Sequence, residues 1–185
     1  MKLFQKVNMA SETVHSYMRS GIVYTGDTAV EAHGGDLVVP AGVITNAVYG
    51  EPDENMFKFV APQTGATNLF ILDPVKVAEA TNSELVYRMG VRTLGLKVNA
   101  GELTAARKID VNDQFLVGVE NLGLTAAPAV GEYFGIDAGK FTHGKLADLS
   151  STTGYAARVD AVRKISQGVG VNGLVDSVLL TVVRI

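Results

Sequence analysis

The stretch His33-Gly34-Gly35-Asp36-Leu37-Val38-Val39-Pro40-Ala41-Gly42 places a short apolar run between two groups of turn-forming residues. Glycine supplies a positive φ, proline presets φ near the value of a turn, and aspartate binds its own backbone, so both groups favour a reversal of the chain. Such groups recur roughly every ten residues, at 25–27, 50–53, 62–65, 99–101 and 137–140. Short apolar runs at this spacing predict an all-β sandwich or barrel.

Alternation of apolar and polar residues supports strands at 85–98, 115–119 and 155–161, because a half-buried strand repeats every second residue. Helix is expected only in short pieces. Residues 11–19 carry Ser11 as a cap before apolar residues at helical spacing. For 74–82, Asp73-Pro74 suits a helix start, whereas the alternation after it favours strand and loop, so both remain open.

Three further segments refine the prediction. Leu69-Phe70-Ile71-Leu72 is apolar throughout and predicts a fully buried strand, and residues 132–143 predict a hairpin around the turn at 137–140. The run Ser177–Ile185 is apolar on both faces, so its own sheet or another subunit must cover it. We expect a mainly antiparallel β-barrel or sandwich, as a single β domain over residues 21–185. Residues 1–20 form an N-terminal arm, or a first segment packed on its own core.

The composition excludes several kinds of partner. The net charge is −3, with a pI near 5.6 and scattered basic residues, so the chain lacks the basic surface that nucleic acids or anionic membranes require. Charged residues make up only 19% of the chain, which favours a surface partly covered by a partner. The start of the chain has no apolar stretch of signal-peptide length.

No group of reactive residues accompanies the β pattern. The chain has no cysteine, and His15, His33 and His143 lie far apart without further ligands at metal-binding spacing. Residues 168–173 match GxGxxG, but too few residues follow for a dinucleotide-binding unit. Residues 110–113 lack the glycine and glutamate of a calcium loop. We therefore expect a protein that is not an enzyme and that binds no metal or cofactor.

Residues 21–42, 128–141 and 154–162 with the C-terminal strand share one rhythm, in which a short apolar run is followed by a glycine turn and another apolar run. In this rhythm, and in ending on a strand, about half of the chain resembles the small, mostly β auxiliary proteins that decorate or stabilise the heads of tailed bacteriophages. No single motif carries the resemblance. The family has no shared active site, so it transfers no functional residues.

The resemblance implies a non-enzymatic virion protein on the capsid exterior, made in the host bacterial cytoplasm. Its implied partners are the major capsid protein and copies of itself. A phage tail or baseplate β protein remains an alternative, as does a ligand-binding β-barrel or a small enzyme. The last two require a concave pocket with convergent polar groups.

Both ends of the chain carry apolar side chains that would be hazardous if exposed. We expect the N-terminal segment, and secondarily the terminal strand, to pack against a neighbouring subunit or the capsid protein. The residues of this predicted interface are Leu3, Phe4, Val7, Met9, Val178, Leu180, Val182 and Ile185.

Overall fold

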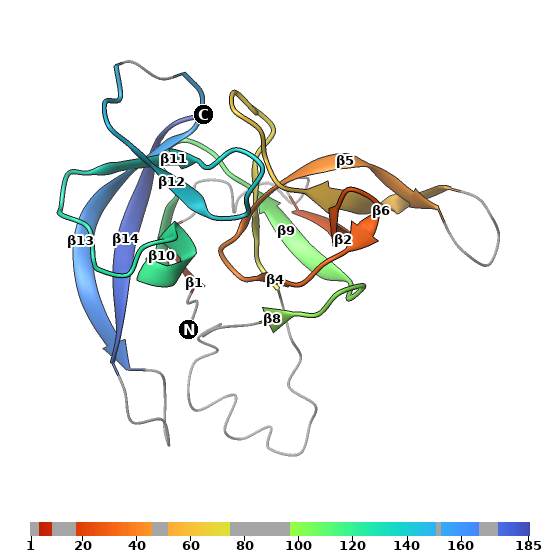
Figure 1. Cartoon of the computed structure of the whole chain (residues 1–185), viewed down its shortest axis with the longest axis horizontal. Coiled ribbons are helices and arrows are strands. Elements are labelled where there is room, and N and C mark those ends of the chain that lie inside the picture. The colour runs from red at the N-terminus through yellow and green to blue at the C-terminus, as the bar shows by residue number, and fades with distance from the viewer. Residues whose placement is uncertain (1–3, 9–17, 46–51, 75–96, 151–152, 167–173) are drawn as a thin grey trace.

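A computed structural model describes residues 4–8, 18–45, 52–74, 97–150, 153–166 and 174–185. Within them the fold is all-β, as predicted, with one short 3-10 helix. Two β units make up the molecule: a five-stranded mixed barrel and an antiparallel half-barrel. They lie side by side in Figure 1.

The barrel is built from strands between residues 18 and 108. Its order is β2 (Met18–Thr25), β6 (Pro52–Val60), β5 (Leu37–Thr45), β7 (Phe70–Leu72) and β9 (Thr104–Lys108). The β2–β6 pair is parallel, and β2 also pairs with β9, which closes the barrel. Strand β3 (Thr28–Ala29) pairs with β2, and β4 (Ala32–His33) pairs with β8 (Lys97–Val98).

The half-barrel contains both described ends of the chain. Its order is β1 (Phe4–Asn8), β10 (Gln114–Gly118), β14 (Leu174–Arg184), β13 (Ala156–Ser166), β11 (Tyr133–Ile136) and β12 (His143–Leu146). The 3-10 helix η3 (Val119–Leu122) directly follows β10. Strand β14 pairs with β13 along one edge and, at Ser177–Thr181, with β10 along the other. Its own sheet therefore covers both edges of the terminal strand over Ser177–Thr181.

Alternate residues of β5 and β7 enter two different cores. Leu37 pairs with Ile71, and both face the core shared with the half-barrel. The neighbouring pair, Val38 and Phe70, faces the barrel interior. Because both faces are covered, all three residues of β7 are buried, which confirms the fully buried strand expected at Leu69–Leu72.

At two glycines, other parts of the chain pack so closely that a side chain does not fit without a shift. Gly35 has φ 86°, and a Cβ there would lie 3.0 Å from the Cβ of Phe4. In the barrel, a Cβ on Gly21 would lie 2.2 Å from the carbonyl oxygen of Phe57. A larger residue at either position requires the backbone or a core ring to move.

Hydrogen bonds connect the two units at the Gly34–Gly35 turn. The Asn121 side chain in η3 donates to the Gly34 carbonyl at 3.1 Å, and His143 Nε2 lies 3.4 Å from the Gly35 carbonyl. The Leu37 amide donates to the carbonyl of Phe141, in the β11–β12 loop, at 2.8 Å. Polar side chains from the half-barrel thus satisfy backbone groups of the barrel.

Other predicted elements differ in detail. The hairpin at 132–143 is confirmed as β11–β12, with its second strand starting at His143. The strand expected at 115–119 ends at Gly118, because Val119 begins η3. In β13, Val159 pairs with Leu180 and Ala161 with Leu179, so Asp160 forms a bulge that interrupts the alternation.

The helix predictions need a correction where they can be compared. Met18 and Arg19, the end of the helix expected at 11–19, belong to strand β2 and pair with β9. The pairing with a neighbouring strand overrides the local helical spacing. Residues 11–17, residues 75–82 of the second possible helix and residues 85–96 of a predicted strand lie outside the described residues.

Candidate functional site

The apolar residues predicted for a subunit interface lie mostly inside the chain. Phe4 is 1% exposed, and Val178, Leu180 and Val182 are fully buried in the core of the half-barrel. Ile185 is half-buried and packs against the same core. A side chain without accessible surface adds no area to a contact between folded chains. For Phe4, the structure shows the alternative stated for the first segment, packing on its own core.

The other three predicted residues give less information. Val7 lies in β1, and Leu3 and Met9 lie outside the described residues. A contact through the chain ends therefore stays a prediction. Among the described residues, exposed apolar side chains lie at several places, and some of them lie on two hairpins that project from the body.

The first projecting hairpin is formed by β13 and β14, which extend beyond the rest of the half-barrel (Figure 1). Gly118, the last residue of β10, pairs with Ser177, and the chain then turns into η3. Strand β14 continues past this point to Leu174, paired there only with β13 among the described strands. The outer part of the hairpin is a two-stranded ribbon.

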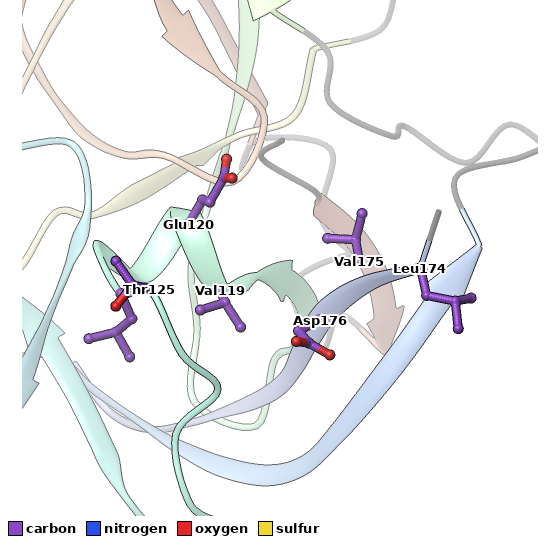
Figure 2. Close-up of a pocket in the computed structure, with 7 residues that line it drawn as sticks. Val119, Glu120, Thr125, Leu174, Val175 and Asp176 are labelled. Carbon is purple, nitrogen blue, oxygen red and sulfur yellow. The ribbon is translucent and has the colours of Figure 1, made fainter. Parts of the chain in front are cut away.

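A groove of about 480 Å³ lies where β10 leaves the sheet. Two sets of residues line it: Val119, Glu120, Leu124 and Thr125 in and after η3, and Leu174–Asp176 in β14. Figure 2 shows the Leu174 side chain directed away from η3, and the Glu120 and Asp176 carboxylates directed apart. The groove follows the part of the β14 edge with which no described strand pairs.

Apolar side chains are exposed on this hairpin. Leu174 is 62% exposed at its outer end, and Val162 is 37% exposed farther in, where its partner Val178 also pairs with β10. Lys164 Nζ lies 3.1 Å from Asp176 Oδ1 on the paired strands, so the acidic residue on the groove side has a basic partner within the ribbon. The ribbon therefore presents an open strand edge, apolar side chains and a neutralised carboxylate.

The second projecting hairpin is the outer part of β5 and β6, on the opposite side of the molecule (Figure 1). Strand β5 pairs with β7 only at Leu37 and Val38, and β6 pairs with β2 only from Met56 onward. Among the described strands, only the end of this hairpin is two-stranded, where Ile44 pairs with Asp53 and Thr45 with Pro52. Val43, which is 42% exposed, lies at the base of this end, and its partner Phe57 also pairs with β2. The molecule thus has ribbons at two opposite ends.

Polar side chains bridge three strands on the half-barrel. Gln114 Nε2 donates to Thr181 Oγ1 at 3.0 Å, Thr181 donates to Asp160, and Arg158 Nε donates to Asp160 at 2.7 Å. Burial acts to raise the pKa of the Asp160 carboxyl, but the hydrogen bonds from Arg158 and Thr181 outweigh it and lower this pKa below its usual range. These bonds hold the bulge of β13 against β14.

The two histidines within the described residues, His33 and His143, contact neighbouring side chains that fit a structural role. His33 is half-buried in β4, 4.0 Å from Asp36. His143 is 1% exposed, with its Nδ1 3.5 Å from the Tyr155 hydroxyl. Burial raises the pKa of Tyr155 far above its usual value, and the charge of Asp113 adds to this. Neither His143 nor Tyr155 is accessible to a substrate.

The segment Asp110–Asp113 forms a tight turn between β9 and β10. The Asp110 amide donates to Asp113 Oδ2 at 2.8 Å, and Asn112 has φ 72°. The Asp113 side chain is fully buried. Its carboxylate therefore holds the turn. No group of three or more acidic or histidine residues in the described ranges is placed to hold a metal ion. His15 and residues 168–173 lie outside those ranges.

Comparison with protein-family models, curated proteins and solved structures found no match. Within the described part of the chain, no helix is long and apolar enough to cross a membrane. What the structure defines is an all-β protein with two projecting ribbons and a groove beside one of them.

Sequence reasoning missed the edge at Leu174–Asp176. The predicted terminal strand began at Ser177, three residues too late, and the apolar pair Leu174-Val175 was the signal that it starts earlier. Strand β10 flanks only part of β14, because the chain turns into η3 after Gly118. The sequence pattern contains no information on this register.

Proposed function

We propose that this chain is a non-enzymatic structural protein of a tailed-bacteriophage virion. It binds the exterior of the assembled capsid and stabilises or decorates it. Its partners are the major capsid protein and further copies of itself, after synthesis in the bacterial cytoplasm. The proposal combines the resemblance of the sequence to capsid auxiliary proteins with the shape of the folded chain.

The observation that carries the proposal is the pair of projecting ribbons. They leave the body on opposite sides (Figure 1). Exposed aliphatic residues lie on them or at their bases: Val43 at the base of one, Leu174 on the other and Val162 at its base. A domain with contact elements at two ends can bridge neighbouring capsomers. A protein that binds only the assembled lattice stabilises the lattice by mass action.

The interior of the protein suits this mechanical role. The buried side chains of Asn121 and His143 contact the carbonyl oxygens of Gly34 and Gly35 at the junction of the two β units. The junction thereby holds the barrel and the half-barrel, and with them the two ribbons, in a fixed relation. A bridging protein needs such rigidity so that it resists separation of the subunits that it joins.

The test is to quantify the chain by mass spectrometry in purified virions of the phage that encodes it, with tail-less heads and isolated tails as separate samples. We expect it in heads, at a copy number that scales with the number of capsomers. Removing it and adding it back should lower and then restore the temperature at which heads release DNA. Enrichment in tails, or absence from virions, would overturn the capsid assignment.

A further inference from the structure

We infer that two copies of this chain pair through the open edge of β14 at Leu174–Asp176, in antiparallel orientation about a two-fold axis at Val175. This contact does not depend on the capsid role, because it rests on the geometry of one strand edge. It also differs from the predicted contact through the chain ends, since it uses the opposite end of β14.

The direction of the backbone groups on this edge follows from hydrogen bonds farther along the strand. The Val182 amide donates to the Asp113 carbonyl, and the Asn112 amide donates to the Val182 carbonyl, each at 2.9 Å. Val182 therefore points its backbone groups toward the β10 side of β14. Successive residues alternate in this direction, and the β10–β14 register is regular from Ser177 to Thr181.

By this alternation, Leu174 and Asp176 also direct their amide and carbonyl groups to the β10 side, beyond the point where β10 ends. Such an edge is a template for another strand. In an antiparallel pair, Leu174 of one copy would lie opposite Asp176 of the partner subunit and exchange both backbone hydrogen bonds with it. The contact is self-complementary, as a two-fold interface requires.

Pairing of two copies would also stabilise the two-stranded ribbon. A two-stranded hairpin is marginally stable on its own, and three or more strands are needed for stability. Joining two copies at this edge converts two ribbons into one four-stranded sheet. Because the Lys164–Asp176 pair already neutralises the carboxylate, the contact brings no unpaired Asp176 charge to the interface.

Apolar side chains lie beside the edge of β14 that forms the proposed contact. Leu174 is 62% exposed and directed away from its own η3 (Figure 2). Val119 and Leu124 line the groove beside the same edge. Each copy therefore presents an exposed apolar side chain, a groove that Val119 and Leu124 line in part, and one strand edge side by side. Because the same edge serves both partners of a two-fold pair, a second copy of the chain is the occupant.

The decisive test uses Val175→Cys in a chain that otherwise has no cysteine. In the proposed register, Val175 lies at a non-hydrogen-bonded position facing itself, with Cα atoms about 4.5 Å apart, within the roughly 4.4–6.8 Å range of disulfides. Val43→Cys is the matched control, because Val43 is an exposed valine on the opposite hairpin.

Under mild oxidation, V175C should form the covalent dimer at least roughly tenfold faster than V43C, because the interface raises the effective concentration of the two thiols. Equal rates for the two variants, or no disulfide dimer of V175C, would overturn the proposal. Non-reducing electrophoresis gives the readout.

A second experiment measures mass in solution. The wild-type chain should sediment as a dimer, and Leu174→Asp should shift it to the monomer, because it replaces the exposed apolar side chain at the contact with a charge that has no partner there. Val43→Asp should leave the dimer intact. A circular dichroism spectrum of L174D that matches wild type shows that the fold is retained. A monomeric wild type, or a dimer unaffected by L174D, would refute the contact.

Discussion

The Nδ2 atom of Asn121 donates a hydrogen bond to the carbonyl oxygen of Gly34, 3.1 Å away, across the junction of the two β units. Both groups are buried. The residues are 87 positions apart in the chain, so this bond forms only when the barrel and the half-barrel are in place.

Asn121→Ala should lower the free energy of unfolding by about 1–3 kcal/mol, because it leaves the buried Gly34 carbonyl without this donor. Equilibrium urea denaturation followed by circular dichroism measures the change. Ser150→Ala is the control, since its hydroxyl contacts only exposed Asp148 in the described residues. If both variants unfold at the same denaturant concentration, the bond does not tie the units together.

Phe4→Ala should be among the most destabilising single substitutions. Phe4 is 1% exposed, and its ring lies 6.2 Å from that of Phe115. Truncating a buried phenylalanine costs about 3–5 kcal/mol. Leu103→Ala, at a residue that is 54% exposed, is the control and should stay within about 0.5 kcal/mol of wild type. Unchanged stability of F4A would show that β1 is dispensable for the fold.

Two glycine substitutions separate backbone strain from crowding. Gly35 and Gly26 have positive φ values of 86° and 59°, but only at Gly35 does an added Cβ meet a neighbour, Phe4, at 3.0 Å. Gly26→Ala should cost about 1–2 kcal/mol, the strain of a left-handed conformation. Gly35→Ala should cost more than this because the added Cβ also crowds the Phe4 side chain. Thermal denaturation compares them, and equal melting temperatures would contradict the crowding.

The stability of the protein should fall in acid partly through Asp160. Its pKa is lower in the folded chain than in the unfolded one, so ionised Asp160 contributes stability that is fully present above the unfolded pKa. That contribution is lost as the pH falls through the folded pKa. The window lies below about pH 4.

Asp160→Asn should accordingly reduce the difference in stability between pH 6 and pH 3. Denaturant midpoints at both pH values provide the measurement. Asp137→Asn is a suitable control because Asp137 pairs with Lys140 at the surface. An Asp160→Asn variant with the same pH dependence as wild type would exclude this role for the Asp160 carboxyl.

Much of the strand pattern could be predicted from turn residues and alternation. The hairpin around 137–140 and the buried strand at Leu69–Leu72 illustrate this, because their signals lie within a few adjacent residues. The end of the helix expected at 11–19 was wrong at Met18 and Arg19. There the pairing of β2 with β9 decides the structure, and its partner residues lie about ninety positions away in the sequence.

For the candidate site, the sequence indicated only that the terminal segment was apolar on both faces. Val178, Leu180 and Val182 face the core, and β10 and β13 cover the strand edges. The open edge at Leu174–Asp176 arises because β10 ends at Gly118 while β14 continues. The sequence of one strand does not show where the strand that pairs with it ends.

The sequence by itself determined the all-β class, since glycine, proline and aspartate at short intervals leave room for strands and for little else. Tertiary structure decided which apolar runs became core and which surfaces stayed open. Leu37 and Val38 are equally apolar neighbours, yet they enter two different cores. Leu174 and Leu180 share one strand, yet one is exposed and the other buried. The physical reason is that burial depends on which strands pair and where each one ends, and these are long-range properties of the chain.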